Sequence, residues 1–483
     1  MKRILSLVLI VVTLILLLPT ASVSAEETVY APDLTSSNVS SGLRDNSAET
    51  YETLEEITIS SDSDIKSLYI VFRKTALGFT VDCNNESSYF EGKYLQYYAD
   101  ISGIFTGETK SVTITFDDAV SICEIHAFGE GTLPEFVHNW NAPLEKADLL
   151  LFSTHADDEH LFFAGILPYY AGVMGYRVQV AYFTDHVNNP ERRHEMLDGL
   201  WTVGIKNYPV ISDYPDQKSE SYEEALANLT NRGYTEDDII AYQTMLLRRF
   251  KPMVAVGHDL EGEYGHGQHM LNAHTLTKAV ELAADENAYP DSVVGCGTWD
   301  TPKLYLHLYN ENPITLNWDT PLQCFDGLSA FQVSKKGFDH HKTQHKYFKD
   351  WLGYDSASEV TEDSPCYFGL YRSTVGEDIK KNDFFENITT YAEQERIAAE
   401  EAARLEEELK LQQEESQKAE EETELVFEEE TIEEAEENVK AKEDPDKPTF
   451  NTDIILFIVI AVIAIASVVV TVSFSKKTGK KKK

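Results

Sequence analysis

The feature that most constrains the fold of this chain is a largely apolar run followed directly by one histidine and three acidic residues. The run is Ala147–Phe152, and the polar stretch that follows it is Ser153–Glu159, with the sequence STHADDE. A second strand-like run, Met253–Gly257, precedes the polar cluster Glu261–His269, with the sequence EGEYGHGQH. Ligands of open α/β sheets gather beyond the carboxyl ends of strands. The two clusters therefore predict an α/β domain with one shared site.

The residue types in these clusters indicate a metal site. His266 and His269 are spaced so that one turn of backbone can present both to one ion. Together the clusters offer His155, Asp158 and His269 as three ligands, which would leave a zinc ion an open position for water. A single histidine beside aspartates usually lies in a solvated loop, but two such clusters after two strand-like runs favour a metal.

The same residues resemble a known enzyme family. His155–Glu159 is similar to the His-Pro-Asp-Asp-Glu signature of the PIG-L/LmbE family of zinc-dependent N-acetylglucosamine de-N-acetylases, and Gly265–His269 is similar to its Gly-His-x-Asp-His motif. Ala156 stands where the family has proline. Gln268 stands where it has aspartate, and it cannot supply that negative charge. Shorter matches extend the resemblance over residues 146–347: Arg192-x-x-Glu195 with Val203–Ile205, Pro302–His307, and Lys336 leading to His341–Gln344.

The resemblance implies a hydrolase that removes the N-acetyl group from N-acetylglucosamine-type sugars with the help of Zn²⁺. The implied metal ligands are His155, Asp158 and His269. Asp157 matches the general base of the family. Adjacent residues in an extended strand point to opposite sides, so this division of labour between Asp157 and Asp158 requires the backbone to turn sharply there.

Four further residues have expected roles. His266 resembles the acid and oxyanion partner of the family, and Tyr264 could donate a second hydrogen bond to that oxygen. Arg192 resembles the arginine that contacts the sugar, although an ion pair with Glu195 on the same helix is an alternative. Glu159 is expected to orient a metal ligand rather than to bind the ion itself.

Two functions of different classes remain open. The first is a zinc-dependent N-deacetylase acting on an N-acetylated glycan or glycoconjugate, or an amidase acting on another N-acyl substrate by the same mechanism. The second is a surface glycan-binding protein whose hydrolase domain is not catalytic. The presence of Asp157 and of all three implied ligands favours the enzyme. The formal net charge of -41 argues against nucleic acid as a partner, because there is no basic face to neutralise phosphates.

The two ends of the chain predict a topology. Residues 1–25 have the charged start, apolar middle and small-residue end of a signal peptide. Residues 454–474 are long and apolar enough for a transmembrane helix, and the lysine-rich residues 475–483 would form a basic cytoplasmic tail. These features predict a single-pass protein of the cell membrane with an extracellular catalytic domain.

Between the ends, the composition predicts four segments. Residues 26–140 read as an all-β sandwich that resembles discoidin-like (F5/8 type C) modules, which either binds glycan or merely packs against the enzyme. Residues 141–350 read as the deacetylase domain with a Rossmann-like, mostly parallel sheet, followed by an extension over 351–390. Residues 391–450 are rich in glutamate and predict a helical or partly disordered stalk rather than a coiled coil. The five cysteines form no obvious framework, with Cys83–Cys123 or Cys296–Cys324 as possible pairs.

Overall fold

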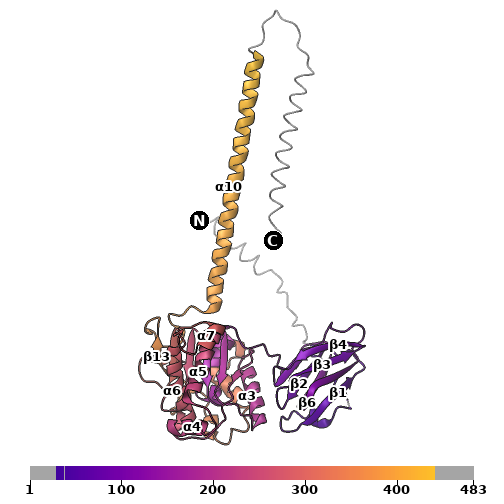
Figure 1. Cartoon of the computed structure of the whole chain (residues 1–483), viewed down its shortest axis with the longest axis vertical. Helices are drawn as coiled ribbons and strands as arrows, with labels where there is room; N and C mark the ends of the chain where they lie inside the picture. The colour runs from indigo at the N-terminus through magenta and orange to yellow at the C-terminus, as the bar shows by residue number, and fades with distance from the viewer. Residues whose placement is uncertain (1–28, 37, 441–483) are drawn as a thin grey trace, which may run out of the picture. The chain divides into compact units, whose positions relative to one another are not determined.

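The computed structural model describes residues 29–36 and 38–440, and the chain divides into two compact units, residues 1–396 and 397–483. The first unit begins with an antiparallel β region, drawn in indigo and purple in Figure 1. Its elements are η1 (Ser41–Leu43), β1 (Glu52–Ser60), β2 (Ser67–Phe72), β3 (Gly78–Cys83), β4 (Glu86–Glu91), β5 (Gln96–Asp100) and β6 (Ser111–Phe128). The strand order is β4-β3-β6-β2-β5, and β1 also pairs with β6.

Strand β6 is the central strand of this region, because it pairs with three other strands along its length. The half around Ile114 pairs with β1 and β3, and the half around Ile125 pairs with β2. Every residue of β2 is buried, which agrees with its apolar sequence SLYIVF. The all-β character predicted for this part is thus observed, while the discoidin-like assignment stays a prediction.

A second, seven-stranded sheet forms the centre of the remainder of the first unit. Its strands are β7 (Leu149–Ser153), β8 (Val178–Tyr182), β9 (Val210–Ile211), β10 (Val254–Gly257), β11 (Lys303–His307), β12 (Pro313–Thr315) and β13 (Tyr367–Ser373). The order is β12-β13-β11-β10-β7-β8-β9, with β11 to β9 parallel and β12 and β13 antiparallel at one edge. The predicted mixed α/β class is therefore confirmed. The Rossmann-like assignment stays a prediction.

Helices cover both faces of this sheet, because successive side chains of a buried strand alternate between two cores. Leu149 and Leu151 of β7 pack in one core, and Leu150 and Phe152 pack in the other. The first core is closed by α3 (Pro190–Thr202) and α8 (Ala330–Phe338), and the second by α5 (Glu236–Phe250) and α6 (Gly267–Leu282). Figure 1 shows α5 and α6 beside each other. Burial on both faces thus explains why Leu149–Phe152 of β7 are apolar at four successive positions.

The remaining helices are short. They are α2 (Asp158–Leu161), η2 (Pro168–Val173), α4 (Tyr222–Thr230), η3 (Glu263–Gly265), α7 (Pro290–Cys296), η4 (Gln323–Phe325), α9 (Lys349–Leu352) and η5 (Ala357–Glu359). Helix starts follow local sequence signals: α5 begins with a capping box between Thr235 and Asp238, and α3 begins with an Asn189 cap followed by Pro190.

The order of the parallel strands fixes where a ligand site belongs. From β7 the chain proceeds to β8 and β9 on one side, and then to β10 and β11 on the other. The direction of winding therefore reverses between β7 and β10, and the crevice beyond their carboxyl ends is the usual ligand site of such sheets. The two polar clusters, Ser153–Glu159 and Glu261–His269, follow these two strands.

The β region and the helical layer share a polar contact. The buried side chain of Gln96 on β5 donates from Nε2 to Asp198 Oδ1 at 2.6 Å and accepts at Oε1 from Trp140 Nε1 at 3.1 Å. Trp140 in turn lies 5.2 Å from the ring centre of Trp201 on α3. These contacts support a structural partnership of the β region with the enzyme, and they leave glycan binding by that region as a prediction.

The acidic segment predicted as a stalk is helical over α10 (Tyr391–Lys440). Its first turn is fixed to the first unit, since Tyr391 donates its backbone N–H to Asp148 Oδ1 at 2.6 Å and Glu395 accepts two hydrogen bonds from Arg177. Pairs such as Glu406 and Lys410 support the helix further along.

The structure corrects the predicted membrane localisation. Within residues 29–36 and 38–440, no helix combines the length and the apolar character that crossing a membrane requires. Helix α10 is long, but its glutamates would place many carboxylates in hydrocarbon, which is costly. The predicted signal peptide 1–25, transmembrane segment 454–474 and tail 475–483 lie outside the described residues. We therefore no longer assign a membrane-anchored, extracellular topology to this chain.

The five cysteines are unpaired. Cys83, Cys123 and Cys366 are buried, Cys296 is half-buried and Cys324 is exposed. Neither of the two possible disulfides considered from the sequence is formed.

Candidate metal centre and active site

The backbone turns sharply directly after strand β7. Asp157 has a φ of 145°, a value that residues with a Cβ seldom adopt, and α2 begins at the next residue. The turn is held by the Glu159 carboxylate, whose Oε2 accepts a hydrogen bond from the Asp157 backbone N–H at 2.9 Å. This is the change of direction that separate roles for Asp157 and Asp158 require.

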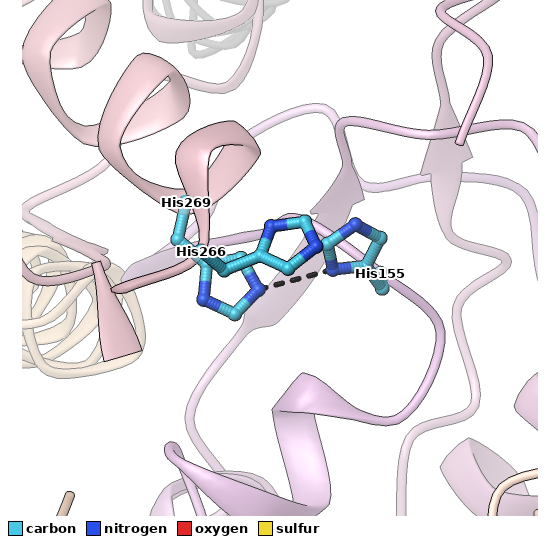
Figure 2. Close-up of side chains that lie close together, drawn as sticks. All are labelled: His155, His266 and His269. Carbon is cyan, nitrogen blue, oxygen red and sulfur yellow. Dashed lines mark hydrogen bonds between the residues drawn. The ribbon is translucent and has the colours of Figure 1, made fainter. Parts of the chain in front are cut away.

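The three residues predicted to bind a metal converge on one point. His155 Nδ1 lies 3.0 Å from His269 Nε2, and Asp158 Oδ2 lies 3.3 Å from the first nitrogen and 3.2 Å from the second. Figure 2 shows the His155–His269 contact as a dashed line, with His269 on its helix, α6, and His155 on the loop opposite. A tetrahedral zinc ion with ligands at about 2.0–2.1 Å holds them about 3.3 Å apart. The donor set and its spacing fit such an ion.

The electrostatics of this point favour a cation. Although burial opposes both shifts, His269 and His155 hold the pKa of Asp158 well below its usual range, and Asp158 and Glu263 raise the pKa of His269 to about 10. The two buried carboxylates thus stabilise positive charge between them. A divalent ion supplies that charge directly, without a proton on a ligand nitrogen.

A buried glutamate that we did not select from the sequence stands behind the predicted metal ligand. Glu263 Oε2 lies 2.8 Å from Nδ1 of His269 and 2.8 Å from Nδ1 of His258, and its Oε1 lies 2.7 Å from Nδ1 of His307. Burial alone would raise the pKa of Glu263, but His258 and its other histidine neighbours hold it well below the usual range. A carboxylate at Nδ1 fixes the tautomer that leaves Nε2 of His269 free for a metal.

Glu263→Gln is expected to weaken metal binding about 10- to 100-fold while leaving all three predicted ligands in place. Glutamine keeps the shape of the side chain but removes the charge that orients His269. Competition with a chelator of known affinity would measure the change. Glu261→Gln, on the exposed part of the same loop, is the matched control and should leave the affinity unchanged. Equal affinities of Glu263→Gln and the unmodified protein would contradict the orienting role.

The other face of His155 meets Asp216, a second residue that the sequence did not indicate. Asp216 Oδ1 lies 3.5 Å from His155 Nε2, and Gln268 Oε1 lies 3.3 Å from the same nitrogen. Although burial opposes it, His155 and His186 hold the pKa of Asp216 well below its usual range. The negative charge that Gln268 cannot supply is therefore present near the site, on Asp216.

Arg192 lies over the turn and contacts acidic groups rather than Glu195. Its guanidinium donates to Asp157 Oδ1 at 3.2 Å, to Asp216 Oδ2 at 2.9 Å and to the Ala156 carbonyl at 3.2 Å. Glu195 instead accepts hydrogen bonds from the backbone and hydroxyl of Thr343. Burial raises the pKa of Asp157 to about 7, although Arg192 opposes the shift.

A cavity of about 680 Å³ opens beside the predicted metal point. Four residues with expected roles reach it: His155, Asp157, Arg192 and His266. Tyr264 lines it as well, with a φ of 44° and an exposed ring whose centre is 5.6 Å from that of His266. Five aromatic residues that had no predicted role also line it: Phe162, Tyr347, Phe348, Trp351 and Tyr354. The cavity therefore combines a polar base with apolar ring faces.

The structure thus brings together all the residues singled out from the sequence and adds several that were missed. His258 follows strand β10 directly, so the rule that ligands gather at strand ends could have identified it. Glu263 lies inside the second polar cluster, but nothing in the spacing distinguishes it from Glu261. Asp216 lies in an irregular segment and gives no sequence signal. Glu159, which was expected to orient a metal ligand, instead contacts the backbone of Asp157 and holds the turn there. The carboxylate that contacts the predicted ligand His269 is that of Glu263.

Comparisons with known proteins agree with the nature of this site. A segment of 70 residues is 39% identical to a 1D-myo-inositol 2-acetamido-2-deoxy-alpha-D-glucopyranoside deacetylase of Rhodococcus jostii, covering 14% of this chain and 22% of the relative. A longer match of 186 residues, 24% identical, to such a deacetylase of Catenulispora acidiphila covers 34% of this chain and 56% of that relative. The chain thus spans at most about half the length of these relatives. The similarity supports the deacetylase family over the matched segments.

Two further comparisons add little. No protein-family model matches the chain. The solved structure of an N,N'-diacetylchitobiose deacetylase from Pyrococcus horikoshii is similar with a TM-score of 0.35 and 16% identity, over 47% of this chain and 85% of that one. A likeness at that level supports no assignment.

Proposed function

We propose that this chain is a zinc-dependent hydrolase that removes the acetyl group from N-acetylglucosamine-type sugars. The observation that carries the proposal is the triangle of His155 Nδ1, Asp158 Oδ2 and His269 Nε2, with sides of 3.0–3.3 Å, next to the cavity that Asp157 lines. The curated relatives named as deacetylases of an acetamido-glucopyranoside support the same chemistry.

His155, Asp158 and His269 would hold the metal. Two imidazoles and one carboxylate suit zinc, and a zinc ion in such a site polarises an amide carbonyl and lowers the pKa of water to about 7. The protein groups account for the remaining needs of amide hydrolysis, which are a proton acceptor, hydrogen bonds to the carbonyl oxygen and a proton for the departing amine.

Asp157 is the proposed general base. Its carboxylate lines the cavity and comes from the residue next to the predicted ligand Asp158, and Glu159 fixes its backbone. A proton taken from the attacking water at Asp157 can be returned to the amine nitrogen as the C–N bond breaks. Arg192, at 3.2 Å from Asp157 Oδ1, holds the carboxylate in position and itself lines the cavity.

His266 and Tyr264 are the proposed hydrogen-bond donors to the carbonyl oxygen. Both line the cavity, and the ring of His266 lies 4.7 Å from the ring of His155 and 4.7 Å from that of His269. Burial lowers the pKa of His266 to about 3, so the ring is neutral and keeps one N–H. A neutral imidazole suits hydrogen bonding to developing negative charge better than it suits proton transfer to the amine.

The aromatic wall supports a sugar as the substrate. Tyr347, Phe348 and Trp351 line the cavity, and the apolar face of a pyranose ring can pack on such rings. The polar base would then receive the acetamido group. Arg192 and Asp216 also line the cavity and would provide donors and acceptors for sugar hydroxyls.

Acetate release by the purified full chain tests the proposal. The substrates would be N-acetylglucosamine, its inositol glycoside, its β-1,4-linked disaccharide and, as a non-sugar amide, an N-acetyl amino acid. We expect acetate from at least one sugar and none from the amino acid. Activity on the amino acid alone would assign an amidase of other specificity. A metal-loaded chain that releases acetate from none of them would favour a glycan-binding protein without catalysis.

A further inference from the structure

A second group of metal-binding side chains lies outside the triangle described above. Glu159 and His160 are on α2, and His341 follows α8, from a distant part of the sequence. All three side chains are fully buried. Glu159 Oε1 lies 3.5 Å from His160 Nε2 and 3.6 Å from His341 Nε2. These separations are close to the ~3.3 Å between ligands of a tetrahedral zinc ion.

Five polar side-chain atoms of this group have no hydrogen-bond partner among the described residues. Glu159 Oε1 and both ring nitrogens of His160 and of His341 are buried and unsatisfied. Each buried polar atom left without a partner costs about 1–3 kcal/mol. Five such atoms in one place are unusual for a native structure, in which unsatisfied groups are few and call for an unseen water or ion.

Two glycines make room for the group. A Cβ on Gly199 of α3 would lie 2.6 Å from His160 Nε2 and 3.1 Å from His341 Nε2. A Cβ on Gly337 of α8 would lie 2.4 Å from His160 Cε1. The absence of a Cβ at these two positions therefore lets the rings of His160 and His341 pack directly against α3 and α8.

We propose that Glu159, His160 and His341 form a second binding site for a divalent transition metal, with zinc as the ion to test. None of the three side chains reaches solvent, so an ion there would lie out of reach of a substrate and would stabilise the fold rather than act in catalysis. An ion there would tie α2 to the segment after α8. Glu159 would bind it through Oε1 while Oε2 accepts the Asp157 backbone N–H, so the second metal would also stabilise the turn that presents Asp157.

Metal stoichiometry of the full chain tests this site independently of activity. After saturation with zinc and removal of free ion, we expect two equivalents in the unmodified protein by elemental analysis. His341→Gln should retain one equivalent, because it keeps the triangle of His155, Asp158 and His269. His269→Ala should also retain one, bound at the second site.

His340→Ala is the matched control. His340 neighbours His341 in sequence, but its Nε2 contacts the Thr202 hydroxyl at 3.0 Å and it is not part of the group, so two equivalents are expected. An unmodified protein that binds only one equivalent, retained in His341→Gln and lost in His269→Ala, would overturn the second site. A folded His269→Ala protein that binds none, with a normal circular dichroism spectrum, would overturn it as well.

Discussion

Asp157→Asn is expected to lower kcat about 10²- to 10⁴-fold while the fold and the metal content stay unchanged, which is the usual scale for loss of a general base. Asparagine has the shape of aspartate and tolerates a positive φ better than most residues, so the turn at φ 145° can persist. It cannot accept a proton. Steady-state kinetics on the best sugar substrate, with elemental analysis of the same sample, would measure both quantities.

Asp213→Asn is the matched control for Asp157→Asn. Asp213 is exposed and does not line the cavity, so its substitution should leave kcat unchanged. If Asp157→Asn instead lost its metal while Asp158→Asn retained metal and lost turnover, the roles of base and ligand would be exchanged. If Asp157→Asn kept full activity, proton transfer would depend on another group.

Asp158→Asn should weaken metal binding by more than about 10²-fold, because it removes a charged ligand. Loss of a residue that only orients a ligand weakens binding by at most about that much. The carboxylate also accepts the His155 backbone N–H at 2.7 Å, and asparagine can keep that bond through its amide oxygen. Activity should fall with the metal and return only at high zinc concentration. Chelator titration and activity at increasing zinc would measure the change.

The dependence of thermal stability on zinc gives a second measurement of how much Asp158 contributes to metal binding. Zinc at about 100 times its dissociation constant stabilises a folded protein by about 2.7 kcal/mol. At such a concentration we expect zinc bound by His155, Asp158 and His269 to stabilise the unmodified protein by about 2.7 kcal/mol. In Asp158→Asn we expect only a small part of this stabilisation. The comparison is made in His341→Gln, where the second site cannot contribute. An equal zinc-dependent shift in His341→Gln with and without Asp158→Asn would place the ion elsewhere.

Several features of the molecule followed from the sequence. The apolar runs Ala147–Phe152 and Met253–Gly257 indicated buried strands, and they became β7 and β10. A run in which successive residues are apolar is typical of a strand buried on both faces, so such a run is informative by itself. The rule that ligands lie beyond strand ends then predicted that the clusters after these two runs would meet.

The membrane localisation is the prediction that the structure corrected. It was drawn from residues 1–25 and 454–474, which lie outside the described residues, and no described helix has the required apolar length. The Arg192–Glu195 ion pair, considered from the sequence as an alternative role for Arg192, illustrates a different limit. Helical spacing allows that pair, but Glu195 is engaged by Thr343, and Arg192 turns to Asp157 and Asp216.

By itself, the sequence determined the α/β class, the two clusters and the identity of His155, Asp157, Asp158 and His269 as candidates, because residue type and short-range spacing carry this information. Only the tertiary structure decided which charges surround them. Asp216 reaches His155 from an irregular segment, and Glu263 gathers three histidines from separate elements. Such contacts depend on how distant segments pack around the reversal between β7 and β10, and no local pattern encodes that packing.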